Sequence, residues 1–101
     1  MNPIITLHTP LEIALQLASR AKQIRLSLNL TQAGLAKRSG VSLGSLKRFE
    51  HSGQISLESL LQIALVLDRL TEFGSLLLPA SPQSLDDLLT PITTRKKGTL
   101  R

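Results

Sequence analysis

The 101-residue chain contains no cysteine, tryptophan or tyrosine, and it has only two phenylalanines. Without cysteine there can be no disulfide framework, no zinc site built on thiolates and no thiol nucleophile. With so few aromatic residues, the core must be built from leucine, isoleucine, valine and alanine, which favours packed helices over a β-sandwich. A chain of this length forms one small domain. The sequence therefore predicts a single all-α domain.

Other absences narrow the function. The first ten residues lack the basic start and long apolar run of a secretory signal, and no stretch is apolar enough to span a membrane. We therefore expect a cytoplasmic protein with no membrane partner. His8 and His51 are the only histidines, neither near an acid or nucleophile pattern, and no phosphate-cradling glycine loop is present. These features argue against an enzyme, a cofactor or a metal site.

Acidic residues are missing from the middle of the chain, although the net charge of the whole is only +5. From Arg20 to Arg48 there is no acid, and the basic residues are Arg20, Lys22, Arg25, Lys37, Arg38, Lys47 and Arg48. Such segregation is typical of a nucleic-acid-binding face. Two alternatives stay open: a solvated basic surface without a partner, and a face that binds an acidic protein.

Helix signals follow one another along this stretch. Apolar residues recur at helical spacing from residue 11 to Leu28 and predict one buried stripe on a first helix. Pro10 precedes them and suits the first turn of that helix. Asn29 suits the left-handed conformation that ends a helix. Thr31 and Ser42 are N-cap residues for the next two helices, and Gly40 allows the turn between them. We expect the buried side of this helix pair to consist of Leu35, Ala36, Val41, Leu46 and Phe49.

The remainder of the chain predicts two more helices and two appendages. A fourth helix is expected after Ser56, with an apolar face that includes Leu57, Leu60, Leu61, Ala64 and Leu65, and a fifth at about residues 71–78. The predicted division is an arm at 1–10, a helix-turn-helix domain at 11–78 and a tail at 79–101. Residues 4–7 of the arm are a candidate edge strand. Residues 84–89 are a candidate short helix, which needs packing on its own domain, a second subunit or a partner protein.

The third predicted helix has the residues of a DNA-recognition helix. By helical phase, Leu43, Gly44, Lys47 and Arg48 share its outer surface. Lys47 and Arg48 can donate to guanine or phosphate, Leu43 can contact a thymine methyl, and Gly44 permits close approach. We expect Ser42 and Ser45 to donate to bases or phosphates, and Gln32, Lys22, Lys37 and Arg38 to contact phosphates or add to the positive field. The alternative for each is an ordinary exposed residue, and for Ser42 a cap alone.

These residues resemble a known family. The pattern I24-R25, followed by L-T-Q-A-G-L-A-K-R-S-G-V-S from Leu30 and L-K-R-F-E from Leu46, resembles the Cro/C1-type (XRE) helix-turn-helix family. The resemblance implies a five-helix, lambda-repressor-like domain that binds double-stranded DNA. It also implies a structural ion pair between Arg25 and Glu50, which occupy the family's positions for such a pair.

The residues that follow this pattern resemble one subgroup of the family. The run S-L-E-S-L-L from Ser56 is similar to HipB-type regulators of HipBA and HipBST toxin–antitoxin modules, although the proline that usually precedes the fourth helix is absent. This implies a homodimeric repressor of its own operon that binds a HipA-like kinase toxin, a small companion subunit or both. The alternative is a stand-alone regulator of a phage or mobile element.

Dimerisation is expected on physical grounds as well. One small domain offers little surface for tight, specific binding, and two-fold dimers on palindromic operators are the usual solution. The candidate interface lies around the fifth helix and consists of Leu70, Phe73, Leu76 and Leu77. The alternative is that these side chains only close the core of the monomer.

Overall fold

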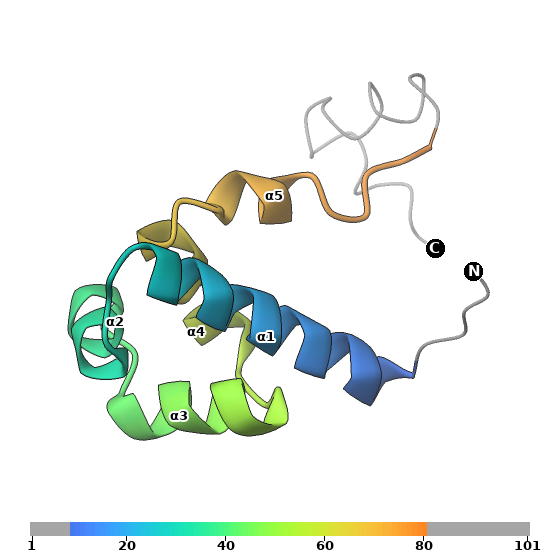
Figure 1. Ribbon diagram of the computed structural model, residues 1–101. Helices are drawn as coiled ribbons and strands as arrows, with labels where there is room; N and C mark the ends of the chain where they lie inside the picture. Colours follow the sequence, from blue (N-terminus) through green and yellow to red (C-terminus); the bar gives the residue numbers. More distant parts are fainter. Residues whose placement is uncertain (1–8, 81–101) are drawn as a thin grey trace.

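The computed structural model describes residues 9–80, which form five α-helices and contain no strand (Figure 1). The helices are α1 (Pro10–Ser27), α2 (Gln32–Ser39), α3 (Leu43–Ser52), α4 (Leu57–Val66) and α5 (Leu70–Gly74). The predicted all-α fold with five helices is confirmed. The candidate strand at residues 4–7 and the candidate helix at 84–89 lie outside the described residues.

Side-chain caps explain where four of the helices begin. Thr9, Thr31, Ser42 and Ser56 each accept a hydrogen bond from a backbone N–H in the first turn of the helix that follows. Such bonds satisfy donors that have no partner within the helix. At α1 the arrangement is reciprocal, because Glu12 Oε1 also accepts from the backbone N–H of Thr9 at 2.9 Å. The predicted caps Thr31, Ser42 and Ser56 are thus confirmed.

The helix ends follow from residues that adopt left-handed backbone conformations. Gly40 ends α2 with φ of 78°, and Asn29, just after α1, has φ of 58°. Both were predicted for this role. Gly53 ends α3 with φ of 79°, and it also lies against α1. A Cβ at Gly53 would come within 2.9 Å of the backbone carbonyl carbon of Ala14, so a residue without a side chain is required at this contact.

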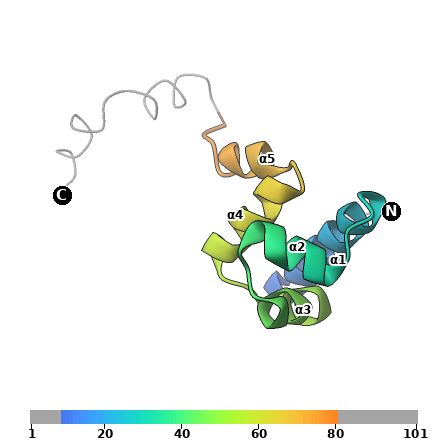
Figure 2. The same cartoon turned by 90° about the vertical axis from the view of Figure 1, so that its left-hand side faces the viewer.

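The core lies where α1, α2, α3 and α4 meet. Helix α1 packs on α3, and α2 packs on both α3 and α4. The largest fully buried side chains are Leu35, Leu46, Phe49 and Ile63. All five residues predicted for the buried side of the helix pair are buried. Figures 1 and 2 show α5 on the opposite side of the domain from α3.

Three expectations from the apolar pattern are wrong in detail. On α4 the buried positions are Ile63 and Ala64, followed by Leu67 at the C-cap, whereas Leu57 and Leu65 are 67% and 63% exposed. Leu28 was expected in the buried stripe of α1 but is exposed. The fifth helix is also shorter than predicted. On α1 and α4 leucine occurs on both sides of the helix, so the pattern alone does not identify the buried face, and after α5 exposed leucines continue the apolar pattern beyond the end of the helix.

Candidate nucleic-acid interface

The candidate recognition helix α3 is held by its own N-terminal residues. Ser42 Oγ accepts from the backbone N–H of Ser45 at 3.1 Å and donates to Ser45 Oγ at 2.9 Å. The hydroxyl proton of Ser42 is therefore used within the protein, while that of Ser45 is available for an external acceptor. Leu43 and Gly44 follow the cap on the exposed side, and no atom outside the local backbone lies within 4 Å of a Cβ built on Gly44.

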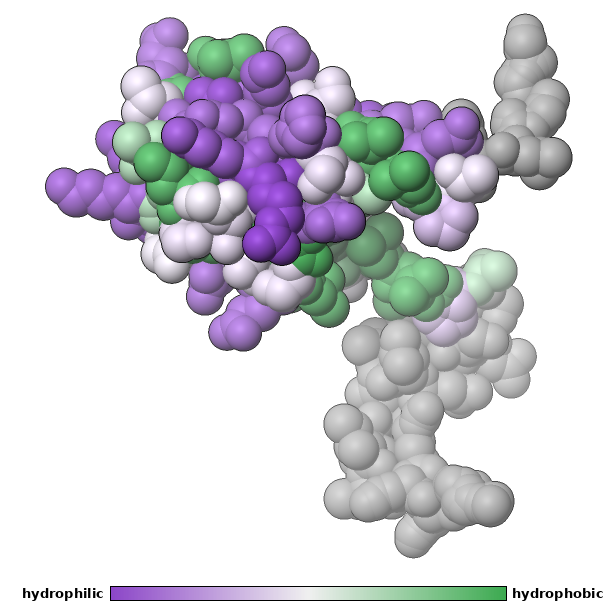
Figure 3. All heavy atoms as spheres, turned by 90° about the horizontal axis from the view of Figure 1, so that it is seen from below, coloured by the Kyte–Doolittle hydropathy of each residue, from purple (hydrophilic) through white to green (hydrophobic). Residues whose placement is uncertain are grey.

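Basic side chains extend from the same helix and from α2. Lys47 and Arg48 of α3 are exposed, as are Lys37 and Arg38 in the last turn of α2. Within residues 9–80, none of these four cations forms a salt bridge; the ion pairs there are Arg25–Glu50 and Arg69–Glu72. The face on which α3 lies is mostly hydrophilic (Figure 3). This surface therefore offers unneutralised positive charge to an anionic partner.

A buried ion pair fixes α3 to the first helix. Arg25 Nε lies 2.8 Å from Glu50 Oε2, and Arg25 Nη2 lies 3.1 Å from Glu50 Oε1. The two side chains are only 7% and 5% exposed. Arg25 Nη1 also donates to the carbonyl oxygen of Leu30 at 2.8 Å. The guanidinium thus joins α1, the turn after it and the end of α3 through a bidentate, charge-assisted contact.

Gln32 belongs to this network, a role that the sequence patterns do not reveal. Its side-chain Nε2 donates to Glu50 Oε1 at 2.9 Å, so one amide hydrogen is used inside the protein. The second amide hydrogen and the exposed start of α2 are what Gln32 can offer to a phosphate. No local sequence signal joins residues 18 positions apart on different helices. Only the packing of α2 on α3 brings Gln32 and Glu50 together.

The candidate dimer residues are spread over and beyond α5. Leu70 begins the helix, and Phe73 is half-buried and lines a cleft that residues of α1 and α4 also line. Leu76 and Leu77 follow the helix and are 61% and 99% exposed. Leu77 has φ of 63°, which places it in a turn. The four residues therefore do not form one helical face, although three of them expose substantial apolar surface.

The residues that the structure describes contain neither a metal-binding cluster nor a membrane-spanning helix. No group of three or more histidine, aspartate or glutamate side chains there is arranged to hold a metal ion. No described helix is long and apolar enough to cross a membrane.

Comparison with known proteins agrees with this geometry. A helix-turn-helix family model matches residues 22–73, just over half of the chain. The match begins in α1 and includes all of α2, α3 and α4 and most of α5. The curated proteins compared with the chain contain no match. The family is one of DNA-binding domains and not of enzymes. The chain belongs to the Cro/C1-type helix-turn-helix family of DNA-binding regulators.

Proposed function

We propose that this protein is a sequence-specific transcriptional repressor that binds a palindromic operator as a homodimer. The observation that carries the proposal is the cluster of exposed, unneutralised cations on α3 and α2, Lys37, Arg38, Lys47 and Arg48, within a helix-turn-helix fold. A helix of this kind fits the major groove of B-DNA, with its early residues against the base edges.

The residues of this surface have different proposed roles. Lys47 and Arg48 donate to guanine O6 and N7 or to phosphate, and Leu43 contacts a thymine methyl. Gly44 lets the helix backbone approach the DNA, and Ser45 supplies a hydroxyl proton. On α2 the proposed phosphate contacts are Gln32, Lys37 and Arg38, which set affinity and register but do not read the sequence. Ser42 contributes as the cap that holds this end of α3 in place.

The proposed dimer places the α5 regions of two chains together. Exposed leucines at and after α5 supply an apolar surface of the kind that marks association. In a two-fold dimer the same patch meets its copy. The proposed division of the chain is an arm at 1–10, this domain at 11–78 and a tail at 79–101.

The proposed biological setting is a toxin–antitoxin operon in a bacterial cytoplasm. The similarity of the α4 sequence to HipB-type regulators supports a partner that is a HipA-like kinase toxin, a small companion subunit or both. The competing proposal is a stand-alone phage or mobile-element regulator of the same family. Both kinds of regulator bind an operator. They differ in whether the regulator also binds a protein partner.

Operator binding is the first test. The full chain is used to select binding sites from a pool of random double-stranded DNA, and affinity for the selected site is measured at several salt concentrations. The variant Lys47→Ala/Arg48→Ala is compared with Lys96→Ala/Lys97→Ala, which removes the same charge from residues outside α2 and α3. We expect the first variant to weaken binding and to lower the salt slope by about 0.9 for each phosphate that it no longer neutralises.

The control variant should keep nearly the full affinity and the full sequence preference. If Lys47→Ala/Arg48→Ala binds the selected site as tightly as the unmodified chain, the proposed DNA surface is wrong. If both variants lose the same affinity, the effect comes from net charge and not from this surface.

The protein partner is tested by co-expression with the products of the neighbouring genes. A toxin–antitoxin regulator should co-purify with an adjacent kinase-like protein or its companion at a fixed stoichiometry. A homodimer that binds its operator and co-purifies with neither product would favour the stand-alone regulator.

A further inference from the structure

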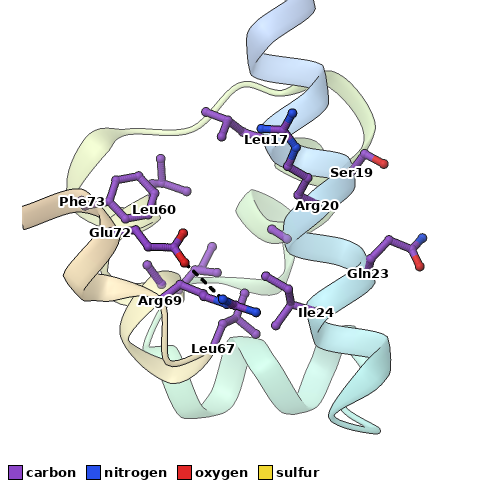
Figure 4. Close-up of a pocket in the computed structure, with 13 residues that line it drawn as sticks. Leu17, Ser19, Arg20, Gln23, Ile24, Leu60, Leu67, Arg69, Glu72 and Phe73 are labelled. Atoms are coloured by element: carbon purple, nitrogen blue, oxygen red, sulfur yellow. Dashed lines mark hydrogen bonds and ion pairs between the residues drawn. The ribbon is translucent and has the colours of Figure 1, made fainter. Parts of the chain in front are cut away.

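The described part of the domain has a cleft of about 490 Å³ that the DNA proposal does not use. Residues of α1, α4 and the α5 region line it, and none of α2 or α3 does. In Figure 4, Leu17 and Ile24 from α1 face Leu60 and Phe73 across the opening. The walls are thus largely apolar, and the cleft is large enough for several side chains of a ligand.

The charged residues at the cleft are mainly basic. Among residues 9–80, the guanidinium of Arg20 has one hydrogen bond, to the uncharged Gln16 at 3.4 Å. Arg69 lies 3.1 Å from Glu72, but these side chains are 49% and 63% exposed. Figure 4 shows both arginines beside the apolar walls. The cleft therefore suits a segment that combines several apolar side chains with more than one carboxylate.

We propose that the occupant of this cleft is the chain's own segment at residues 84–89, S-L-D-D-L-L. In a helical turn Leu85, Leu88 and Leu89 have i, i+3 and i+4 spacing and share one face. Asp86 and Asp87 then lie beside that face. The leucines enter the apolar part of the cleft, and the two carboxylates meet Arg20 and Arg69.

The length of chain between the cleft wall and residues 84–89 supports this occupant. Phe73 forms part of the cleft wall, and Leu85 lies twelve positions after it in the chain. Twelve residues span up to about 40 Å when extended, so the segment can return to the wall it leaves. Pro79 and Pro82 in the connection favour a change of chain direction. Because the segment is tethered, its effective concentration at the cleft is in the millimolar range, at which weak contacts are sufficient.

The absence of cysteine allows a direct test in the full chain. Ser84→Cys provides a single attachment point for a nitroxide spin label, and ¹⁵N spectra of the chain report which backbone amides the label broadens. We expect selective broadening of amides around the cleft, in α1 from Leu17 to Ile24, in α4 after Leu60 and at Phe73. Amides of α3 should keep their intensity. A label at Thr99→Cys is the matched control and should not produce this pattern.

Three further samples make the test decisive. Leu88→Asp and, separately, Asp86→Asn/Asp87→Asn in the labelled chain should reduce the broadening, because they remove the apolar and the ionic contacts respectively. The third sample mixes spin-labelled ¹⁴N chains with unlabelled ¹⁵N chains, so that any broadening arises between molecules. Broadening that appears fully in this mixture means that a second copy fills the cleft and overturns the proposal. So does an absence of broadening, or broadening that survives Leu88→Asp unchanged.

The same spectra separate this proposal from the proposed function. Operator DNA added to the unlabelled chain should shift amides of α2 and α3 whether or not residues 84–89 occupy the cleft. A chain that binds DNA but shows no cleft broadening contradicts only the cleft proposal. A chain that shows the broadening but binds no selected DNA contradicts only the repressor proposal.

Discussion

The α2–α3 unit and the α5 region are built in contrasting ways. Both α2 and α3 begin at side-chain caps and end at left-handed glycines, and Leu35 and Phe49 are each 1% exposed. Helix α5 has five residues, no side-chain cap and no buried residue. The proposed DNA surface therefore lies on a helix pair whose caps and core are supplied by one chain. The α5 region, in contrast, leaves apolar surface that a further segment or subunit can cover.

Each region also has one ion pair, and the two pairs differ in burial. Arg25 and Glu50 are 7% and 5% exposed and connect α1 to α3, whereas Arg69 and Glu72 are 49% and 63% exposed and lie three residues apart. Loss of one partner from a buried pair leaves an unpaired charge in a poorly solvated site. At an exposed pair, water replaces the missing partner.

The largest expected effect comes from breaking the buried pair. Glu50→Gln should lower the free energy of unfolding by about 3–5 kcal/mol, because Arg25 stays buried without its counter-charge. Glu72→Gln is the matched control and should lower it by at most about 1 kcal/mol. Urea denaturation followed by circular dichroism measures both. Equal losses for the two variants would show that the buried pair does not tie α3 to α1.

The second effect concerns the glycines that end α2 and α3. Both adopt φ near 80°, so Gly40→Ala and Gly53→Ala should each destabilise the fold by about 1–2 kcal/mol through backbone strain. Gly53→Ala should destabilise it more, because its Cβ would come within 2.9 Å of the backbone of Ala14, whereas nothing lies within 4 Å at Gly40. Thermal unfolding of the two variants measures the difference. A smaller loss at Gly53 would mean that α1 and α3 separate easily at this contact.

The α2–α3 unit was largely predictable from the sequence because its signals are local. Thr31, Gly40 and Ser42 each act on the residues next to them, and the cap and turn rules apply without knowledge of the rest of the fold. The ion pair Arg25–Glu50 is inferred from a family resemblance, since its members lie 25 positions apart in the sequence. No sequence pattern predicts the hydrogen bond from Gln32 to Glu50, because this bond depends on how α2 packs on α3.

The α4 and α5 regions were less predictable because leucine dominates them. From Leu57 to Leu67, leucines recur on more than one side of α4, so hydrophobic periodicity does not select the face that Ile63 and Leu67 bury. The predicted end of the fifth helix, at about residue 78, lies beyond its observed end at Gly74 for a related reason. Leu76, Leu77 and Leu78 continue the apolar pattern, but no core lies beneath them, and Leu77 adopts a turn conformation instead.

A smaller loss of stability is expected from substitutions at Ser42 and Ser45. Comparing the two distinguishes the capping role of Ser42 from its hydroxyl contact with Ser45. Ser42→Ala removes the acceptor for the backbone N–H of Ser45 and should destabilise the fold by about 1 kcal/mol. Ser45→Ala keeps that cap and removes only the bond between hydroxyls, so its effect should stay below about 0.5 kcal/mol. Chemical denaturation compares the two. Ser42→Ala also removes the bond between hydroxyls, so equal losses for the two variants would show that this bond, and not the cap, holds the start of α3.

The smallest expected effect is a gain in stability, and it can be measured in both α3 and α5. Gly74 of α5 and Gly44 of α3 both lack a left-handed φ, and a Cβ built on either has no atom within 4 Å. Alanine at each position should therefore stabilise the fold by about 0.4–1 kcal/mol, because it restricts the unfolded chain. Thermal unfolding measures this gain, which should be similar at the two sites.

Operator affinity then distinguishes the two glycines. As long as dimerisation is unchanged, which size-exclusion chromatography checks, Gly74→Ala should leave affinity for the selected DNA unchanged, since α5 lies on the opposite side of the domain from α3. Gly44→Ala should weaken it, because the added methyl group stands where the α3 backbone is proposed to approach the DNA. If both variants bind DNA as tightly as the unmodified chain while gaining stability, close approach at Gly44 is not required. Recognition would then depend on the long side chains of Lys47 and Arg48, which can reach the groove from a greater distance.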